Sequence, residues 1–187
     1  MSEVPSIRLP ALPPAQIADA VQAALTEDPA RASWLRAGAA ASIAHGAEDA
    51  AARRFQTVLE LCFLVASADG FVDAERVQLA RLLESITEAA IDRGALELHF
   101  TELDAAVNAL GRRERMARLA ADIEGSAAVD EALAVATLVA LADGELAGPE
   151  YAALMELGEL LGFEATRVRS RIDEVVGGLV RRLEANR

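Results

Sequence analysis

The chain has 187 residues, of which 53% are hydrophobic and 4% aromatic, and its 30 acidic residues exceed its 18 basic residues to give a net charge of −12. A surface this acidic repels nucleic acids and anionic membranes, so we expect no nucleic-acid binding, whereas metal cations and basic partners are compatible with it. The single cysteine, Cys62, excludes an intramolecular disulfide and a multi-cysteine zinc site.

Residues 1–14 hold four of the six prolines and are expected to form an extended arm. The first residues lack the basic and apolar regions of a signal peptide. The longest uncharged stretches run to about a dozen residues, against the roughly 20 that a bilayer span requires. We therefore expect a soluble, cytoplasmic protein that is not transmembrane.

The segment 15–47 is expected to form N-terminal helices. Ile17, Val21 and Leu25 recur at fourfold spacing and predict a helix over about 15–26. Asp28 followed by proline is typical of the N-cap and first turn of another helix. Trp34, the only tryptophan, is expected to anchor these helices on the core.

Stronger apolar periodicity from residue 48 to 187 predicts a single helical domain. Two segments are apolar on nearly every side and should form central helices, 48–68 and 126–142. Further helices are expected at 74–92, 96–109, 112–124, 149–161 and 165–184. Gly94 should close the helix at 74–92, and Gly111 should divide the next two. No segment alternates with period two for long enough to predict a strand, so the sequence predicts an all-α fold: one compact domain of about seven to nine helices.

A short motif occurs twice, as "ASADGFVDAERVQLARLLE" at 66–84 and as "ALADGELAGPEYAALMELG" at 140–158. Each copy places Asp-Gly at the end of an apolar helix, at Asp69 and Gly70 and again at Asp143 and Gly144. Glycine suits such a turn because it adopts the left-handed conformation. The aspartate is harder to explain, because the partial negative charge at a helix C-terminus disfavours a carboxylate by about 0.3–1 kcal/mol.

Two explanations of the aspartates remain open. In the first, each carboxylate accepts backbone N–H groups of its own turn, as in an Asx turn. In the second, the repeats are related by a pseudo-twofold axis that brings the turns together around a cation. The candidate ligands of such a cation are Asp69, Asp73, Glu75, Asp143 and Glu150. Oxygen ligands favour Ca²⁺, Mg²⁺ or Mn²⁺ over zinc. Neither copy is an EF-hand, because Val65 and Val139 stand where its first ligand would be.

These motifs resemble those of the TerB-like family of tellurite-resistance and stress-response proteins, whose hallmark is two copies of Ala-Asp-Gly, an apolar residue two positions on, and a Glu soon after. The resemblance covers about 48–184. The second copy matches better, with Glu150 seven residues after Asp143, whereas in the first copy Arg76 stands at that position and Glu75 precedes it. The resemblance implies a helical, non-enzymatic domain that binds a divalent metal and works in stress-response complexes, often near the membrane.

Catalysis has little support in the sequence, which has no phosphate-binding loop, nucleophile elbow or zinc-protease motif. The arginine-rich segments 112–118, 167–171 and 181–182 contain or adjoin acidic residues and are interpreted as solvated helix faces with local ion pairs. We expect the protein to bind protein partners. A homo-oligomer and a peripheral membrane complex are both compatible with this expectation. Two functions stay open: a cation-binding module, and a metal-free interaction scaffold whose Asp-Gly turns are structural caps.

Overall fold

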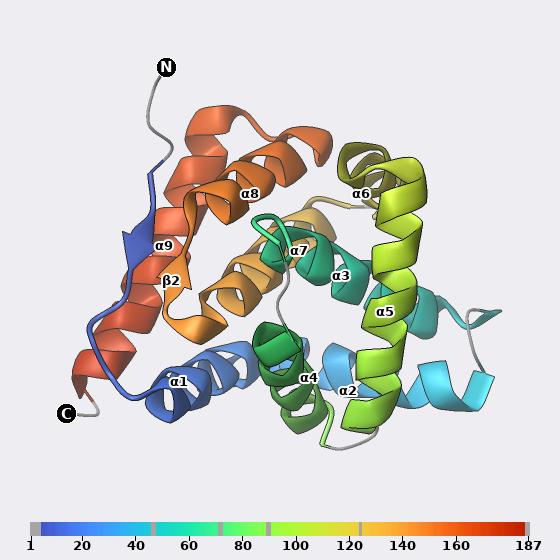
Figure 1. Ribbon diagram of the computed structural model, residues 1–187, viewed down its shortest axis with the longest axis horizontal. Coiled ribbons are helices and arrows are strands. Elements are labelled where there is room, and N and C mark those ends of the chain that lie inside the picture. The colour runs from blue at the N-terminus through green and yellow to red at the C-terminus, as the bar shows by residue number, and fades with distance from the viewer. Residues whose placement is uncertain (1–4, 46–47, 71–72, 89–90, 124, 186–187) are drawn as a thin grey trace.

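The computed structural model describes residues 5–45, 48–70, 73–88, 91–123 and 125–185, and within these ranges the chain forms nine α-helices and two short strands (Figure 1). The first part comprises β1 (Ile7–Arg8), α1 (Pro14–Glu27), α2 (Pro29–His45), α3 (Ala50–Ala66), α4 (Asp73–Ile86) and α5 (Arg93–Leu110). The second comprises α6 (Arg112–Ala121), α7 (Ser126–Ala140), the 3₁₀ helix η2 (Leu141–Asp143), β2 (Glu145–Leu146), α8 (Gly148–Leu160) and α9 (Ala165–Ala185). The predicted all-α fold is confirmed.

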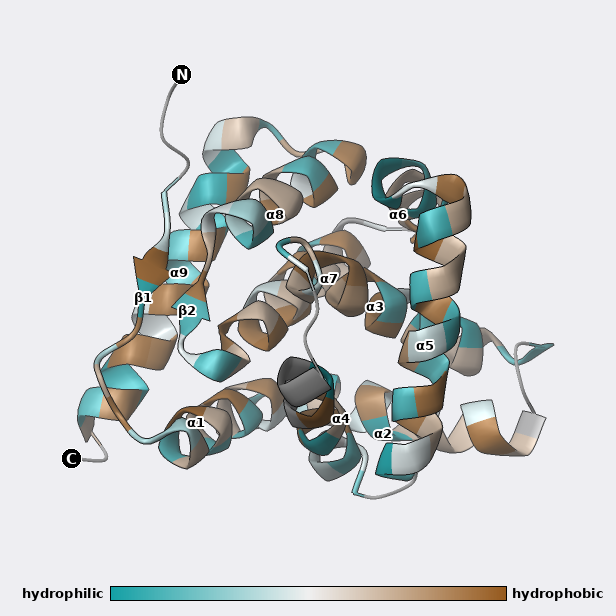
Figure 2. Ribbon diagram, in the orientation of Figure 1, coloured by the Kyte–Doolittle hydropathy of each residue, from teal (hydrophilic) through white to brown (hydrophobic). Residues whose placement is uncertain are grey.

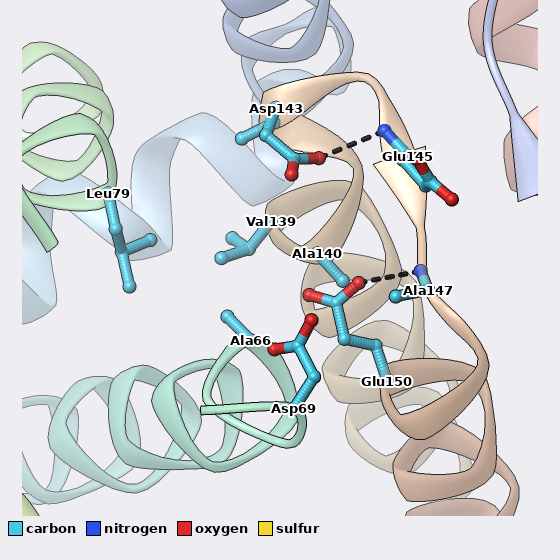
Figure 3. Close-up of a pocket in the computed structure, with 10 residues that line it drawn as sticks. Ala66, Asp69, Leu79, Val139, Ala140, Asp143, Glu145, Ala147 and Glu150 are labelled. Carbon is cyan, nitrogen blue, oxygen red and sulfur yellow. Dashed lines mark hydrogen bonds between the residues drawn. The ribbon is translucent and has the colours of Figure 1, made fainter. Parts of the chain in front are cut away.

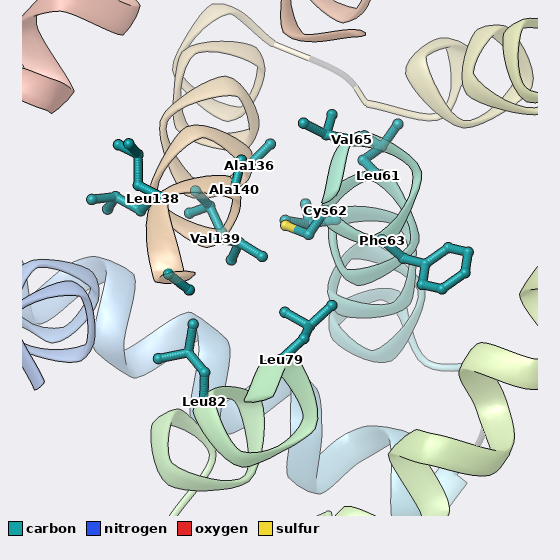
Figure 4. Close-up of a cluster of buried hydrophobic side chains, with 14 of the residues drawn as sticks. Leu61, Cys62, Phe63, Val65, Leu79, Leu82, Ala136, Leu138, Val139 and Ala140 are labelled. Carbon is teal, nitrogen blue, oxygen red and sulfur yellow. The ribbon is translucent and has the colours of Figure 1, made fainter. Parts of the chain in front are cut away.

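The centre of the fold is the pair α3 and α7, the two helices that the sequence predicts as central. Every residue of 58–65 in α3 and of 132–140 in α7 is buried, and both helices are hydrophobic along most of their length (Figure 2). Figure 4 shows them side by side, with the Cys62 side chain directed toward α7. Burying a Leu, Val or Phe side chain contributes about 1.5–3 kcal/mol, so this pair supplies much of the stability of the core.

The two N-terminal helices pack on the same core. Asp28 accepts a hydrogen bond from the backbone N–H of Ala30 at 2.8 Å, as expected of the N-cap of α2. Gly38 lets α2 approach α3, because a Cβ atom there would lie only 2.5 Å from Cβ of Phe55. Trp34 lies partly buried against the core, with the Arg54 guanidinium 4.9 Å from the centre of its ring. The domain boundary predicted between residues 47 and 48 stays a prediction.

The N-terminal arm corrects the expectation of a chain without strands. Ile7 pairs with Leu146 and Arg8 with Glu145 in a two-stranded antiparallel sheet (Figure 2). Leu9 continues the contact, since its N–H donates to the carbonyl of Gly144 at 2.9 Å and its side chain is buried. Strands of two residues are too short to show an alternating pattern, and their pairing joins segments that lie far apart in the sequence. Neither fact can be read from local sequence.

The predicted end of the helix at 74–92 is wrong. α4 ends at Ile86, after which Thr87 bonds through its hydroxyl to the carbonyl of Leu83 at 2.9 Å and Glu88 takes a positive φ of 53°. Asp92 then caps α5 by accepting from the N–H of Ala95 at 3.1 Å. Gly94 therefore lies in the first turn of the next helix and does not close α4.

None of the helices in the described ranges combines the length and the hydrophobicity that a membrane span requires.

The order of the elements repeats, since α3 leads through the first Asp-Gly turn into α4, and α7 leads through η2 and β2 into α8. The pseudo-twofold axis that would relate these two halves stays a prediction.

Candidate functional site

The first Asp-Gly turn follows α3 directly. The N–H of Ser67 donates to the carbonyl of Phe63 at 2.9 Å, and that of Gly70 donates to Ser67 at 3.3 Å. Gly70 has a φ of 105°, which only glycine adopts readily, and this explains its place in the motif. The Asp69 side chain is exposed, and the backbone N–H groups that follow Gly70 in the turn lie outside the described residues.

The second turn has more internal hydrogen bonds. Asp143 accepts from the N–H of Glu145 at 2.9 Å, which is the Asx turn that the structural explanation predicts. Glu150, in the first turn of α8, reaches back to accept from the N–H of Ala147 at 2.8 Å and so caps that helix. Gly144 has a φ of 100°. Both predicted ligands of the second copy, Asp143 and Glu150, therefore have structural roles.

One pocket of about 260 Å³ joins the two turns. Its apolar lining comprises Ala66, Leu79, Val139, Ala140, Ala142 and Ala147, and its acidic lining comprises Asp69, Asp143, Glu145 and Glu150. Figure 3 shows the carboxylates of Asp69 and Glu150 pointing toward one another across the pocket, whereas that of Asp143 is turned to its own backbone. Three of the five predicted ligands thus line one pocket, although they come from distant parts of the sequence.

A nearby arginine offsets the negative charge at the end of α3. Arg112, from the start of α6, donates through Nη2 to the carbonyl of Ser67 at 2.5 Å. Burial lowers the pKa of Arg112 from its usual range, and the negative charges of Asp69 and Glu156 oppose this shift. A cation at a helix C-terminus is favourable, so Arg112 supplies part of the compensation that Asp69 requires.

Sequence reasoning missed the role of Arg112 and the place of Glu145. The interpretation of 112–118 as a solvated face with local pairs holds for Arg118 and Glu114, which lie 3.1 Å apart. It fails for Arg112 and for Arg115, which binds the buried Glu60 on α3 with one contact at 2.8 Å. No local pattern could reveal these contacts. Glu145 could have been found, because it directly follows the second Asp-Gly pair.

The described acidic side chains offer the type of ligand atom that a divalent cation prefers, but too few of them lie together to hold one. Carboxylate oxygens are the ligands that Ca²⁺, Mg²⁺ and Mn²⁺ prefer. In the ranges that the structure describes, however, no group of three or more His, Cys, Asp or Glu side chains could hold a metal ion. Asp73 and Glu75 lie in the first turn of α4, and their side chains are outside the described residues. A complete ligand set would need these two.

Comparisons with protein-family models, with curated proteins and with solved structures found no match to the chain. The resemblance to TerB-like proteins therefore depends on the two Ala-Asp-Gly motifs alone and stays a prediction.

Proposed function

We propose that the protein is a non-catalytic helical module of the TerB-like type, which binds a divalent cation in the acidic pocket between its two Asp-Gly turns. In this proposal it works with protein partners in a stress-response complex, as the resemblance implies. A link to tellurite resistance is suggested by that resemblance alone.

The observation that carries the proposal is the position of Asp69 and Glu150. They come from different copies of the motif, and their carboxylates point toward one another across one pocket (Figure 3). Two carboxylates that face each other repel, and a cation between them removes that repulsion. Arg112 reaches only the side of the first turn, where it bonds to Ser67, and it is not part of the pocket lining.

The five acidic residues have different roles in this proposal. Asp69 and Glu150 bind the cation directly from opposite walls. Asp73 and Glu75, which follow the first turn, complete the set of oxygen ligands that a hard cation needs. Asp143 holds the second turn through its bond to Glu145 and contributes negative charge to the pocket.

A metal-free interaction scaffold is the second candidate, and the caps of the second copy favour it. Asp143 and Glu150 each accept a backbone N–H within 2.9 Å, as structural caps would without any ion. Under this alternative the acidic pocket is a solvated recess, and binding of a partner occurs on another surface.

Thermal unfolding of the chelator-treated protein, with and without millimolar Ca²⁺, Mg²⁺ or Mn²⁺, tests the proposal. An ion present at a hundred times its dissociation constant stabilises the fold by about 2.7 kcal/mol, which raises the melting temperature of a chain this long by about 5–10 °C. Asp69→Asn should abolish the shift, because it removes a ligand on which no described backbone cap depends.

Asp173→Asn is the matched control, since it removes the same charge from an exposed position on α9. It should leave the shift intact. If none of the three ions changes the melting temperature of the unaltered protein, the scaffold is the better description.

A further inference from the structure

The N-terminal arm shows how an extended segment docks on the surface beside β2. β1 pairs antiparallel with β2 (Figure 2), and the N–H of Leu9 donates to the carbonyl of Gly144 at 2.9 Å. Arg8 forms an ion pair of 3.1 Å with Glu145, and the Leu9 side chain is buried. Backbone pairing supplemented by a few side-chain contacts is the way in which many domains recognise an extended segment of a partner protein.

Few contacts hold the arm in this place. The paired strands are two residues long, and so short a pairing is only marginally stable by itself. Leu9 is the one buried residue of 5–13, whereas five of these residues are exposed: Pro5, Ser6, Arg8, Ala11 and Pro13. A chain terminus with so few buried contacts opens at a low cost in free energy. A segment of similar chemistry can therefore take its place.

A groove of about 840 Å³ begins beside Pro5, the first described residue of the arm. Its lining comes from α8, α9 and the loop between them. It combines the apolar surface of several side chains with three glutamates and one arginine, and its main members are Tyr151, Met155, Phe163, Glu156, Glu159 and Glu164. The excess of negative charge favours a basic occupant, because complementary charge speeds the encounter and excludes acidic segments.

We propose that β2 and this groove together form the docking surface for a partner protein. The partner inserts an extended segment that carries an apolar residue, an arginine and a leucine in the order of Ile7, Arg8 and Leu9, preceded by basic residues. In the free protein the arm covers the part of this surface beside β2. The partner displaces the arm because its segment repeats the contacts with β2 and adds those of its basic residues in the groove. This inference does not depend on a bound cation.

A synthetic peptide tests the surface in the absence of divalent ions. It carries residues 5–11 of the chain preceded by three lysines, and the control peptide has the same residues in scrambled order. In the full-length protein Leu9→Asp should release the arm, whereas Ala11→Asp adds the same charge at an exposed position. We expect fluorescence anisotropy to show that Leu9→Asp binds the peptide about 10-fold more tightly than Ala11→Asp, because a docked arm leaves the surface free for only a small fraction of the time.

A charge reversal in the groove tests the part of the surface that the arm does not cover. Glu159→Lys changes an exposed lining residue, and Glu184→Lys is the matched control at an exposed position of α9 outside that lining. We expect Glu159→Lys to weaken binding of the lysine peptide about 3-fold or more, and Glu184→Lys to leave it unchanged. Equal affinities in the two variants would show that the groove takes no part, which overturns the proposal.

Hydrogen exchange in the unaltered protein does not depend on the folding of a variant. A saturating concentration of the peptide should accelerate exchange at the Leu9 amide of the protein, because displacement of the arm breaks its bond to Gly144. Peptide binding that leaves this rate unchanged overturns the proposal. So does a folded Leu9→Asp protein with a released arm that binds neither peptide, or binds both equally. None of these results bears on the cation, which the unfolding experiments test separately.

Discussion

The two Asp-Gly turns share a sequence motif, but the fold supports them very differently. The second turn is held by an Asx bond at Asp143, by the helix cap at Glu150, by the N-terminal arm and by Ile17 packed against Gly144. At Gly70 of the first turn, a Cβ atom would have no atom of the described residues within 4 Å, and support comes from Arg112 on α6.

This difference separates two roles that the sequence motif combines. In the second turn Asp143 and Glu150 hold the backbone in place through their hydrogen bonds to Glu145 and Ala147, and in the proposed function Glu150 also binds the cation. In the first turn Asp69 is exposed, and the N–H two residues on, which corresponds to the donor at Glu145, lies outside the described residues.

Replacing the glycine of each turn with alanine should produce the largest difference in stability between the two turns. Gly144→Ala combines backbone strain with a contact against Ile17 and should cost about 2–4 kcal/mol of unfolding free energy. Gly70→Ala introduces the strain alone and should cost about 1–2 kcal/mol. Urea unfolding of both variants measures the difference, and equal losses would mean that the packing around Gly144 contributes nothing.

Alanine at the two aspartates should have a smaller effect, measured without divalent ions. Asp143→Ala loses the hydrogen bond to Glu145 and should cost about 1 kcal/mol. Asp69→Ala loses its attraction to Arg112 but also relieves the repulsion at the end of α3, so the net change should stay within about 0.5 kcal/mol.

Urea unfolding again provides the measurement, and Asp173→Ala on the exposed face of α9 controls for the loss of one negative charge. A loss at Asp69 as large as that at Asp143 would show that both aspartates act as caps, against the asymmetry described above.

Much of the fold follows from the sequence because its signals are local. The unbroken apolar runs of α3 and α7 predict their central position, and Asp28 predicts the start of α2. Prediction fails where distant residues decide the structure, as in the pairing of Ile7 with Leu146, two residues that lie far apart in the sequence. It also fails at the end of α4, because Gly94 is a conspicuous helix terminator although Asp92 caps the next helix.

The site was partly predictable for the same reason. A repeated motif at the ends of two central helices indicates that Asp69, Asp143 and Glu150 could meet, and the structure places all three on one pocket. Arg112 could not be predicted, because its contact with Ser67 depends on how α6 packs against the end of α3. The arm that braces β2 lies outside the repeated motif, and its sequence predicts only an extended segment.

The smallest predicted effect is a difference in the rate of thiol alkylation between α3 and α7, the helices that lead into the two turns. Cys62 in α3 is 1% exposed, and burial raises the pKa of its thiol to about 12. At pH 8 only about one thiol in ten thousand is then ionised, so alkylation by iodoacetamide must await opening of the helix. We expect the native protein to react at least about 100-fold more slowly than the chain in urea.

Ala136 occupies the position in α7 that Cys62 occupies in α3, and it is equally buried. The double variant Cys62→Ala with Ala136→Cys moves the thiol to the helix before the braced turn while conserving the total side-chain volume between the two helices. Because α7 leads into the turn that the arm, the Asx bond and Ile17 hold, its thiol should be labelled several-fold more slowly than Cys62. Equal rates, in variants of equal global stability, would mean that the two helix ends open together and that the bracing of the second turn does not reach α7.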